Sequence, residues 1–373
     1  HTRCSVVSWA PEMCIRDRYK IMRIFRIQCG GGIKMKSKSK AAIKVTAVIL
    51  SVAVLVAAIL YAVPNIENKV CRNSNNPEKF GNLSSWMSSV DGNLKLNEIN
   101  IPGTHDSATQ YVQLALFSKC QCLNIKEQLD AGFRYLDIRL AVDNEKLKLV
   151  HGFTSCKTDD YPWNENLCID TVLSQCYDFL KENPSETVLF VVKQENKDDD
   201  TKKFQNIIEN CIKDNPEMWF LDNEIPTLDE ARGKIVLFRR YEDEAQLQDK
   251  SGIKLKWEDQ RGSEIKDLPY EKYELKVGDG SLFVQDRFEY GLADKQNAFE
   301  KSLEDAETVA NKNDVFINFA STKGSLPVGH PYFFAKKMNE RFLQSELEDK
   351  YFGWLIFDYA TSAVASKVIE TNF

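Results

Sequence analysis

The chain has four histidines, at positions 1, 105, 151 and 330, and one of them is followed directly by an aspartate. This pair, His105 and Asp106, stands in the stretch "NIPGTHDSAT", just after a turn-forming Pro-Gly. An imidazole gains and loses a proton near neutral pH more readily than any other ordinary side chain. Its position at the end of a short apolar run therefore indicates acid–base chemistry, and a purely structural histidine is the alternative.

Charged residues also stand at the ends of the other apolar runs. They are His151, Lys193, Arg240, Asp286 and Asp358, and the run 134–142 carries Asp137 and Arg139 within it. If these runs are parallel barrel strands, their carboxyl ends meet at one face, where barrel active sites lie. The pattern predicts one clustered site, and a set of ion pairs along the rim of the barrel is the alternative.

The residue types suggest how such a site would work. Two imidazoles, His105 and His151, can act as a general base and a general acid around one phosphoryl or acyl centre. Each needs a carboxylate to fix its ring, and Asp106 and Asp358 are available. Arg139 offers a planar fork for phosphate oxygens.

Motifs of other mechanisms do not occur in the sequence. It has no Gly-x-Ser-x-Gly nucleophile motif and no Gly-rich phosphate loop before a helix. His330, in "VGHPY", stands in a Gly/Pro loop without a nearby acid, and we interpret it as structural.

Short apolar runs alternate with helical stretches and would position these residues. Eight runs are expected to be strands: "INIPG", and residues 134–142, 148–151, 188–193, 234–240, 281–286, 315–320 and 354–358. Such alternation favours a parallel sheet, and residues 96–373 have the length of one barrel. The predicted fold class is α/β, a distorted (β/α)8 TIM-type barrel preceded by one N-terminal transmembrane helix.

The N-terminal region differs in character from the rest. Residues 1–18 lack any periodicity and resemble translated sequencing adapters, so we interpret them as an artefact. Residues 35–63 combine lysines with an uncharged apolar run from Val45 to Val63, long enough to cross about 28 Å of hydrocarbon. They predict a signal anchor with the catalytic domain outside the cell, or a secreted protein if the signal is cleaved. Residues 64–95 are expected to form a polar stalk.

Charge and cysteine content narrow the possible functions. The net charge is −6, and the lysines before the apolar run leave the remainder still more acidic. An acidic exported domain argues against nucleic acid as a partner, because nucleic-acid binding relies on clustered Lys and Arg. Seven cysteines follow the apolar run, an odd number that leaves at least one thiol unpaired, and their connectivity cannot be read from the sequence.

Several motifs together resemble the bacterial phosphatidylinositol-specific phospholipase C family, of the metal-independent X-domain type. They are "IPGTHDSAT", "FRYLDIRL", "LKLVHG", "ENPSETVLFVVK", "ARGKIVLFRRY", "LFVQDRF", "FINFAS" and "GWLIFDYA", in the family's order from about Trp86 to Ile369. The resemblance implies a diacylglycerol-lyase that cleaves phosphatidylinositol. The inositol 2-hydroxyl attacks phosphorus and expels diacylglycerol, leaving inositol 1,2-cyclic phosphate.

The resemblance also implies a role for each matched catalytic residue. His105 matches the general base and Asp358 its orienting carboxylate, while His151 matches the general acid, supported by Asp106. The remaining matches are Arg139 as the phosphate clamp with Asp137 beside it, and Lys193, Arg240 and Asp286 as residues that hold the inositol hydroxyls. Phe288 stands where the family often has a tyrosine stacked on the inositol ring, so the stacking would remain without the hydroxyl.

Partners and cofactors follow from the same resemblance. We expect phosphatidylinositol or a glycosylphosphatidylinositol as substrate, at a membrane surface, with the protein acting as a monomer. Leu114, Leu116 and Phe117 are candidates for lipid insertion, although such a stripe can equally be core. We expect no cofactor and no metal ion, because Arg139 stands where related calcium-dependent enzymes place calcium ligands.

Two other functions fit parts of the sequence. A metal-dependent glycerophosphodiester phosphodiesterase on a similar barrel would need a cluster of Glu and Asp at the strand ends, which the sequence lacks. A catalytically inactive relative that only binds inositol lipids would have lost His105, His151 or Arg139, and all three are present.

Overall fold

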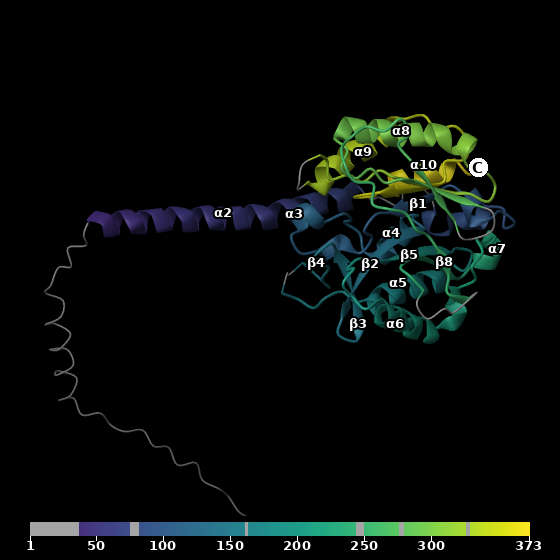
Figure 1. The fold of residues 1–373 in the computed structure, drawn as a ribbon, viewed down its shortest axis with the longest axis horizontal. Coiled ribbons are helices and arrows are strands. Elements are labelled where there is room, and N and C mark those ends of the chain that lie inside the picture. Colours follow the sequence, from purple (N-terminus) through teal and green to yellow (C-terminus); the bar gives the residue numbers. More distant parts are fainter. Residues whose placement is uncertain (1–36, 75–81, 161–162, 244–249, 276–279, 326–328) are drawn as a thin grey trace, which may run out of the picture. The chain divides into compact units, whose positions relative to one another are not determined.

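The computed structural model describes residues 37–74, 82–160, 163–243, 250–275, 280–325 and 329–373 (Figure 1). The chain divides into two compact units, residues 1–58 and residues 59–373. The expected artefact at residues 1–18 lies outside the described residues. Of the first unit, the structure describes one helix.

Eight parallel strands form the barrel. In spatial order they are β8 (Ile253–Lys254), β7 (Ile235–Arg240), β5 (Val188–Gln194), β2 (Tyr135–Asp143), β1 (Ile101–Thr104), β12 (Trp354–Phe357), β11 (Val315–Phe319) and β10 (Ser281–Gln285). The rings of Phe238 on β7 and Trp354 on β12 are 5.2 Å apart although three strands separate them in the sheet. The sheet therefore curls on itself, which confirms the predicted barrel class.

One expected barrel strand is not part of the barrel. Residues 148–151 belong to β3 (Lys146–His151), which runs antiparallel to β2 and continues to β4 (Thr154–Ser155). Two residues connect β2 to β3, and a parallel crossover needs a dozen or more, so only a hairpin is possible. The eighth position is taken instead by β8, a two-residue strand with no apolar run of its own.

The barrel does not close by backbone pairing, because among the described residues no ladder joins β8 to β10. The buried side chain of Gln260 spans the gap. Its Nε2 donates to the Val284 carbonyl at 2.7 Å, and its Oε1 accepts from the Asp286 amide at 2.9 Å. Two further strands occupy these open edges. β6 (Trp219–Phe220) pairs with the same edge of β7 as β8, and β9 (Glu271–Glu274) lies antiparallel on the edge of β10 that β11 leaves open.

Helices surround the strands in two groups. The helices after the first are α3 (Ala115–Ser118), α4 (Ile125–Asp130), α5 (Ile169–Glu182), α6 (Thr201–Lys213), α7 (Leu228–Ala231), α8 (Leu292–Val309), α9 (Pro331–Gln344) and α10 (Ser362–Glu370). Along β5, Val188, Phe190 and Val192 face α4–α6, whereas Leu189 and Val191 face the barrel interior. Helices α8–α10 cover the side formed by β11, β12 and β1 (Figure 1).

The region between the apolar run and the barrel differs from the expected stalk. Helix α2 (Ser37–Ser74) continues through Pro64, and its apolar part is long enough to cross a membrane by length and composition. Residues 59–74 belong to the same compact unit as the barrel. The 3-10 helix η2 (Leu83–Ser89) buries Trp86 and Met87 in the core. Apolar residues at helical spacing, Leu83, Trp86, Met87 and Val90, were the missed signal.

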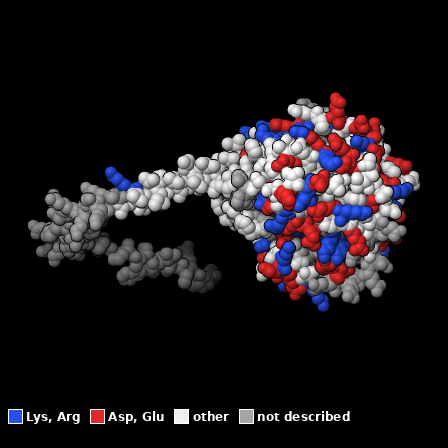
Figure 2. Space-filling view, turned by 45° about the horizontal axis from the view of Figure 1, so that its top comes forward, with Lys and Arg blue, Asp and Glu red and all other residues white. Residues whose placement is uncertain are grey.

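The surface carries both signs of charge. Figure 2 shows Lys and Arg interspersed with Asp and Glu over the visible face of the barrel. Nucleic-acid binding favours a basic stripe or patch, which this face does not present.

Candidate active site

His105 stands directly after β1, at the carboxyl edge of the barrel. Its amide donates to the Phe357 carbonyl at 3.0 Å, which fixes the end of β1 to β12. Gly103 makes the close approach possible, since a Cβ there would lie 2.5 Å from Ile356 Cδ1 and 2.7 Å from Tyr135 Cβ. The tight packing of β1 between its neighbours thus determines where the imidazole lies.

The hydrogen bonds of His105 determine its tautomer. Nδ1 lies 2.8 Å from Asp358 Oδ1, and Nε2 lies 2.7 Å from Arg139 Nη2. A guanidinium can only donate, so Nε2 accepts, and Nδ1–H donates to the carboxylate. The unprotonated nitrogen therefore faces the guanidinium.

The pKa of His105 is raised above its ordinary value. Burial lowers this pKa and so does Arg139, but the Asp358 and Asp106 carboxylates raise it by more. If His105 takes up a proton, these two carboxylates stabilise the imidazolium that forms.

Arg139 on β2 is held by three carboxylates. Its Nε lies 3.2 Å from Asp106 Oδ1, its Nη2 donates to Asp137 Oδ2 at 3.0 Å, and its Nη1 lies 3.7 Å from Glu195 Oε1. Burial raises the pKa of Asp137, but Arg139 and His105 together lower it by a larger amount. The pKa of Asp137 is therefore below its ordinary value. The guanidinium is thereby fixed next to His105 Nε2.

His151 faces His105 from the end of β3. Its Nδ1 lies 2.7 Å from the Ser118 carbonyl, which can only accept, so Nδ1 carries a proton and Nε2 points toward the site. The two rings are 6.2 Å apart and nearly perpendicular. Asp106 Oδ2 lies 3.5 Å from His151 Nε2 and 3.4 Å from His105 Nε2. Asp106 therefore stands between the two imidazoles rather than beside one of them.

Asp106 is strained and buried. Its backbone has a φ of +42°, and only 2% of its surface is exposed. Burial is the largest influence on its pKa and raises it, although Arg139 and both histidines act in the opposite direction. A non-glycine residue at positive φ is uncommon and is found mostly where function or tight packing requires it.

The structure brings all ten predicted site residues together. A cavity of about 650 Å³ is lined by eight of them: His105, Arg139, His151, Lys193, Arg240, Asp286, Phe288 and Asp358. Asp106 and Asp137 lie beneath, against Arg139. His151 reaches the cavity although β3 runs antiparallel, because the hairpin returns it to the level of Arg139 on β2.

Among the residues missed at the sequence level, Glu195 lines the cavity and Trp257 contacts two residues that line it. Glu195 lies 2.8 Å from Lys193 Nζ, and Arg139 and Lys193 lower its pKa to about 2 against the effect of burial. Strand alternation was the available signal, because Glu195 follows Lys193 at the spacing of one strand face. Trp257 stacks under Arg240 at 3.5 Å and donates to Asp286. It follows β8, the strand without a sequence signal.

His330 forms structural contacts, but it has an acidic partner that the sequence did not show. Its Nε2 lies 2.6 Å from Glu67 Oε1 and its Nδ1 lies 2.7 Å from the Leu116 carbonyl. Its acidic partner is distant in sequence, on α2, and therefore could not be seen from the local sequence.

Some of these groups could reach a common cation. Ligand atoms of His105, Asp106 and Asp137 lie within 4.8 Å of one another. Both carboxylates, however, already contact the guanidinium of Arg139. A metal ion there would compete with a fixed positive charge, so the donor set does not fit one well.

The fold and the site together define a class: a parallel α/β barrel with paired imidazoles and a guanidinium at the carboxyl edge of its strands. The family described as "Phosphatidylinositol-specific phospholipase C, X domain" matches residues 99–241. A 1-phosphatidylinositol phosphodiesterase of Staphylococcus aureus (strain Newman) is 30% identical over 314 residues, covering 77% of this chain and 94% of that protein. The chain belongs to this phospholipase C family.

Other relatives agree with this assignment. A 1-phosphatidylinositol phosphodiesterase of Listeria monocytogenes is 33% identical over 162 residues, 41% of this chain and 47% of that protein. The solved phosphatidylinositol-specific phospholipase C of Staphylococcus aureus superimposes with a TM-score of 0.66 at 26% identity, covering 78% of this chain and 98% of that one.

Proposed function

We propose that this chain is a phosphatidylinositol diacylglycerol-lyase, which cleaves phosphatidylinositol to diacylglycerol and inositol 1,2-cyclic phosphate. The observation that carries the proposal is the arrangement of partners around the His105 ring. Its unprotonated Nε2 lies 2.7 Å from Arg139 and faces a second imidazole across the cavity. A general base, a phosphate clamp and a general acid are therefore within reach of one phosphorus atom.

The first part of the reaction uses His105 and Arg139. A bound phosphodiester would draw the guanidinium toward its oxygens, and the inositol 2-hydroxyl would replace Arg139 as the donor to Nε2. As the hydroxyl oxygen bonds to phosphorus, its proton passes to Nε2, and Asp358 stabilises the imidazolium. Arg139 balances the negative charge that grows on the phosphoryl oxygens.

The second part uses His151. The bond from phosphorus to the glycerol oxygen breaks, and a protonated Nε2 of His151 gives its proton to that oxygen. The Ser118 carbonyl holds the ring by its Nδ1–H, which keeps Nε2 directed at the leaving group. No side-chain nucleophile is needed because the substrate supplies its own hydroxyl.

The far side of the cavity suits an inositol ring. Lys193, Arg240, Asp286 and Glu195 offer donors and acceptors for hydroxyl groups, and Phe288 offers an apolar ring face. These groups fit phosphatidylinositol and also a glycosylphosphatidylinositol, in which the same ring carries the glycan.

The mouth of the cavity suits a membrane surface. Leu114, Phe117 and Phe153 line it and expose 52%, 41% and 90% of their surfaces. Leu116, the third candidate for insertion, does not line the cavity. With α2 as an uncleaved anchor, the barrel would act outside the cell; a cleaved signal would release it. Action as a monomer stays part of the proposal.

The alternative functions are less well supported. A metal-dependent glycerophosphodiester phosphodiesterase would need carboxylates available to a metal ion, whereas Arg139 contacts Asp106 and Asp137. A protein that only binds inositol lipids would not require two imidazoles whose rings are each held at Nδ1, by Asp358 and by the Ser118 carbonyl.

The test is a product assay. The purified full chain is incubated with phosphatidylinositol vesicles in EDTA, and phosphorus NMR follows the cyclic phosphate. We expect the cyclic product to form without added metal. Release of inositol 1-phosphate alone, or activity that returns only with calcium, would contradict the proposed mechanism.

A further inference from the structure

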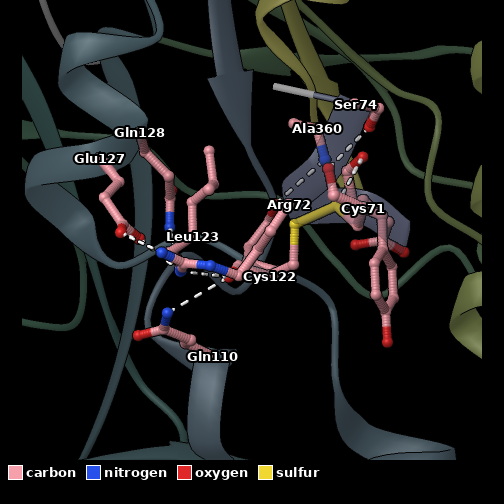
Figure 3. The surroundings of a disulfide bond; sticks show 12 residues. Cys71, Arg72, Ser74, Gln110, Cys122, Leu123, Glu127, Gln128 and Ala360 are labelled. Atoms are coloured by element: carbon pink, nitrogen blue, oxygen red, sulfur yellow. Dashed lines mark hydrogen bonds and ion pairs between the residues drawn. A yellow bond between two sulfur atoms is a disulfide. The ribbon is translucent and has the colours of Figure 1, made fainter. Parts of the chain in front are cut away.

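The end of α2 is attached to the barrel at three places. Cys71 forms a disulfide with Cys122, and both residues are almost fully buried. The guanidinium of Arg72 binds the Glu127 carboxylate with two hydrogen bonds, of 2.8 and 2.5 Å. Figure 3 shows Arg72 and the disulfide side by side against the segment that carries Cys122. The His330–Glu67 contact is the third attachment.

The disulfide ends a segment that enters the active site. Gln121 precedes Cys122, and its Nε2 donates to the carbonyls of His105 and Phe357, both at 2.8 Å. Its Oε1 accepts from the Ala360 amide at 3.2 Å. One side chain thus connects the end of β1, which carries His105, to the end of β12, which precedes Asp358.

The residue before Gln121 lies between the catalytic groups. The Cys120 carbonyl accepts from the Tyr359 amide at 2.5 Å, and its sulfur lies 3.9 Å from His151 Nδ1. The sulfur also lies within 4.8 Å of His105 and Asp358 ligand atoms. A shift of the segment 120–122 would therefore change the spacing of His105, Asp358 and His151 together.

The third attachment supports the same region. His330 Nδ1 bonds the Leu116 carbonyl in α3, and α3 leads to Ser118, whose carbonyl holds His151. Glu67 on α2 is the partner of the other imidazole nitrogen of His330. The end of α2 therefore contacts the supports of both proposed catalytic histidines.

We propose that residues 67–72 of α2 are a positioning element of the active site, and that the Cys71–Cys122 disulfide makes them so. The inference rests on the proposed function. On reduction by a dithiol, Cys71 and Cys122 each gain an electron and a proton while the dithiol becomes a cyclic disulfide. The segment 120–122 then loses its covalent support next to His105. Export to an oxidising compartment would complete the active site.

The experiment compares the oxidised and reduced full chain in lipid vesicles. Dithiothreitol reduces the protein, mass spectrometry confirms the state of Cys71 and Cys122, and oxidised glutathione restores the disulfide. A catalytic group displaced by about 1 Å can cost about 10²-fold in rate, so we expect kcat to fall by roughly 10-fold or more on reduction. We expect KM to change by less than about twofold, because the residues proposed to hold the inositol ring lie elsewhere in the barrel.

A matched variant distinguishes loss of the Cys71–Cys122 disulfide from effects of dithiothreitol at other cysteines. The double variant Cys71→Ser/Cys122→Ser should show the low kcat without reductant and should not respond to dithiothreitol. Cys211→Ser, on α6, should behave as wild type. If the double variant does not fold, the test is the reversible change of kcat when wild type is reduced and reoxidised well below its melting temperature.

A second readout does not depend on activity. The chain has four histidines, so isotope-labelled imidazoles can be resolved, and the pH at which His105 titrates can be followed by NMR. We expect a lower pKa of His105 in the reduced protein, because the Asp358 contact raises it. An unchanged kcat and an unchanged His105 titration after full reduction would show a purely stabilising link and overturn the proposal. Failure of the oxidised protein to cleave phosphatidylinositol would instead refute the proposed function.

Discussion

The proton of the neutral His105 ring lies on Nδ1, which leaves Nε2 able to act as a base. Asp358 accepts from Nδ1 and Arg139 donates to Nε2, so both neighbours select the same tautomer. His151 is oriented independently, by the Ser118 carbonyl. Two imidazoles with opposite requirements can therefore operate in one cavity, since each has its own partner.

Removing either imidazole tests the proposed roles. His105→Ala and His151→Ala should each lower kcat by about 10² to 10⁴-fold, because each removes one proton transfer in the transition state. Production of diacylglycerol from vesicles measures the rate, and circular dichroism checks the fold. Near-normal turnover of either variant would show that its imidazole is not in the reaction.

The pH dependence tests the Asp358 contact. His105 must be unprotonated to act as a base, and its pKa is raised, so the acid limb of kcat/KM should lie above the ordinary histidine value of about 6.5. Asp358→Asn removes a charge that stabilises the imidazolium, so the limb should move to lower pH while the maximum rate falls. A limb that stays in place would mean that another group titrates there.

At the scale of elements, short connections decide the geometry of the site. The tight hairpin from β2 to β3 brings His151 back beside Arg139, and the side chain of Gln260 replaces a missing ladder between β8 and β10. Gln260 bonds the amide of Asp286, which is proposed to hold an inositol hydroxyl. The open edge of the barrel is therefore structurally linked to the substrate cavity.

Replacing Gln260 should affect both stability and substrate binding. Gln260→Ala leaves the Val284 carbonyl and the Asp286 amide without their partner, at a cost of about 1–3 kcal/mol each in the free energy of unfolding. We expect a lower urea midpoint and a higher KM, with a smaller change in kcat. Gln344→Ala, at the exposed end of α9, is the control and should change none of these values. Unchanged stability of the Gln260 variant would mean that water replaces its bonds at no cost.

At the scale of the whole molecule, three exposed apolar residues stand at the mouth of the cavity. Phe153 stands between the paired strands β3 and β4 with 90% of its surface exposed, and Phe117 and Leu114 line the same cavity. Large apolar side chains so exposed are costly in water, and they mark contact surfaces for lipid or protein. The substrate of the proposed reaction is a membrane lipid, so a bilayer is the fitting partner.

A double substitution tests that contact. Phe117→Ser/Phe153→Ser should lower activity on phosphatidylinositol vesicles by roughly 10-fold or more, since burying one Phe side chain contributes about 1.5–3 kcal/mol. Activity on a short-chain phosphatidylinositol below its micelle concentration should stay near wild type. Phe373→Ser at the C-terminus is the control. Equal losses on both substrates would place the two phenylalanines in catalysis rather than at the lipid surface.

Much of this protein was determined by the sequence itself. Seven of the eight barrel strands have apolar runs of their own, and their charged ends mark the site because parallel strands finish at one edge. The roles of the ten site residues stay predictions, and the structure adds that they meet around one cavity. The order of apolar and charged residues was sufficient to predict these strands, because a buried strand consists mostly of apolar residues.

Only the tertiary structure decided the features that depend on partners far apart in the chain. The sequence could not show that Asp106 stands between two imidazoles, that Gln260 closes the barrel, or that Cys71 pairs with Cys122. Nor could it show that the expected stalk packs on the barrel, since its helix is stabilised by Glu127 and His330. Apart from the turn that joins His105 and Asp106, such contacts join residues 24 to 263 positions apart, and periodicity reports only neighbours within an element.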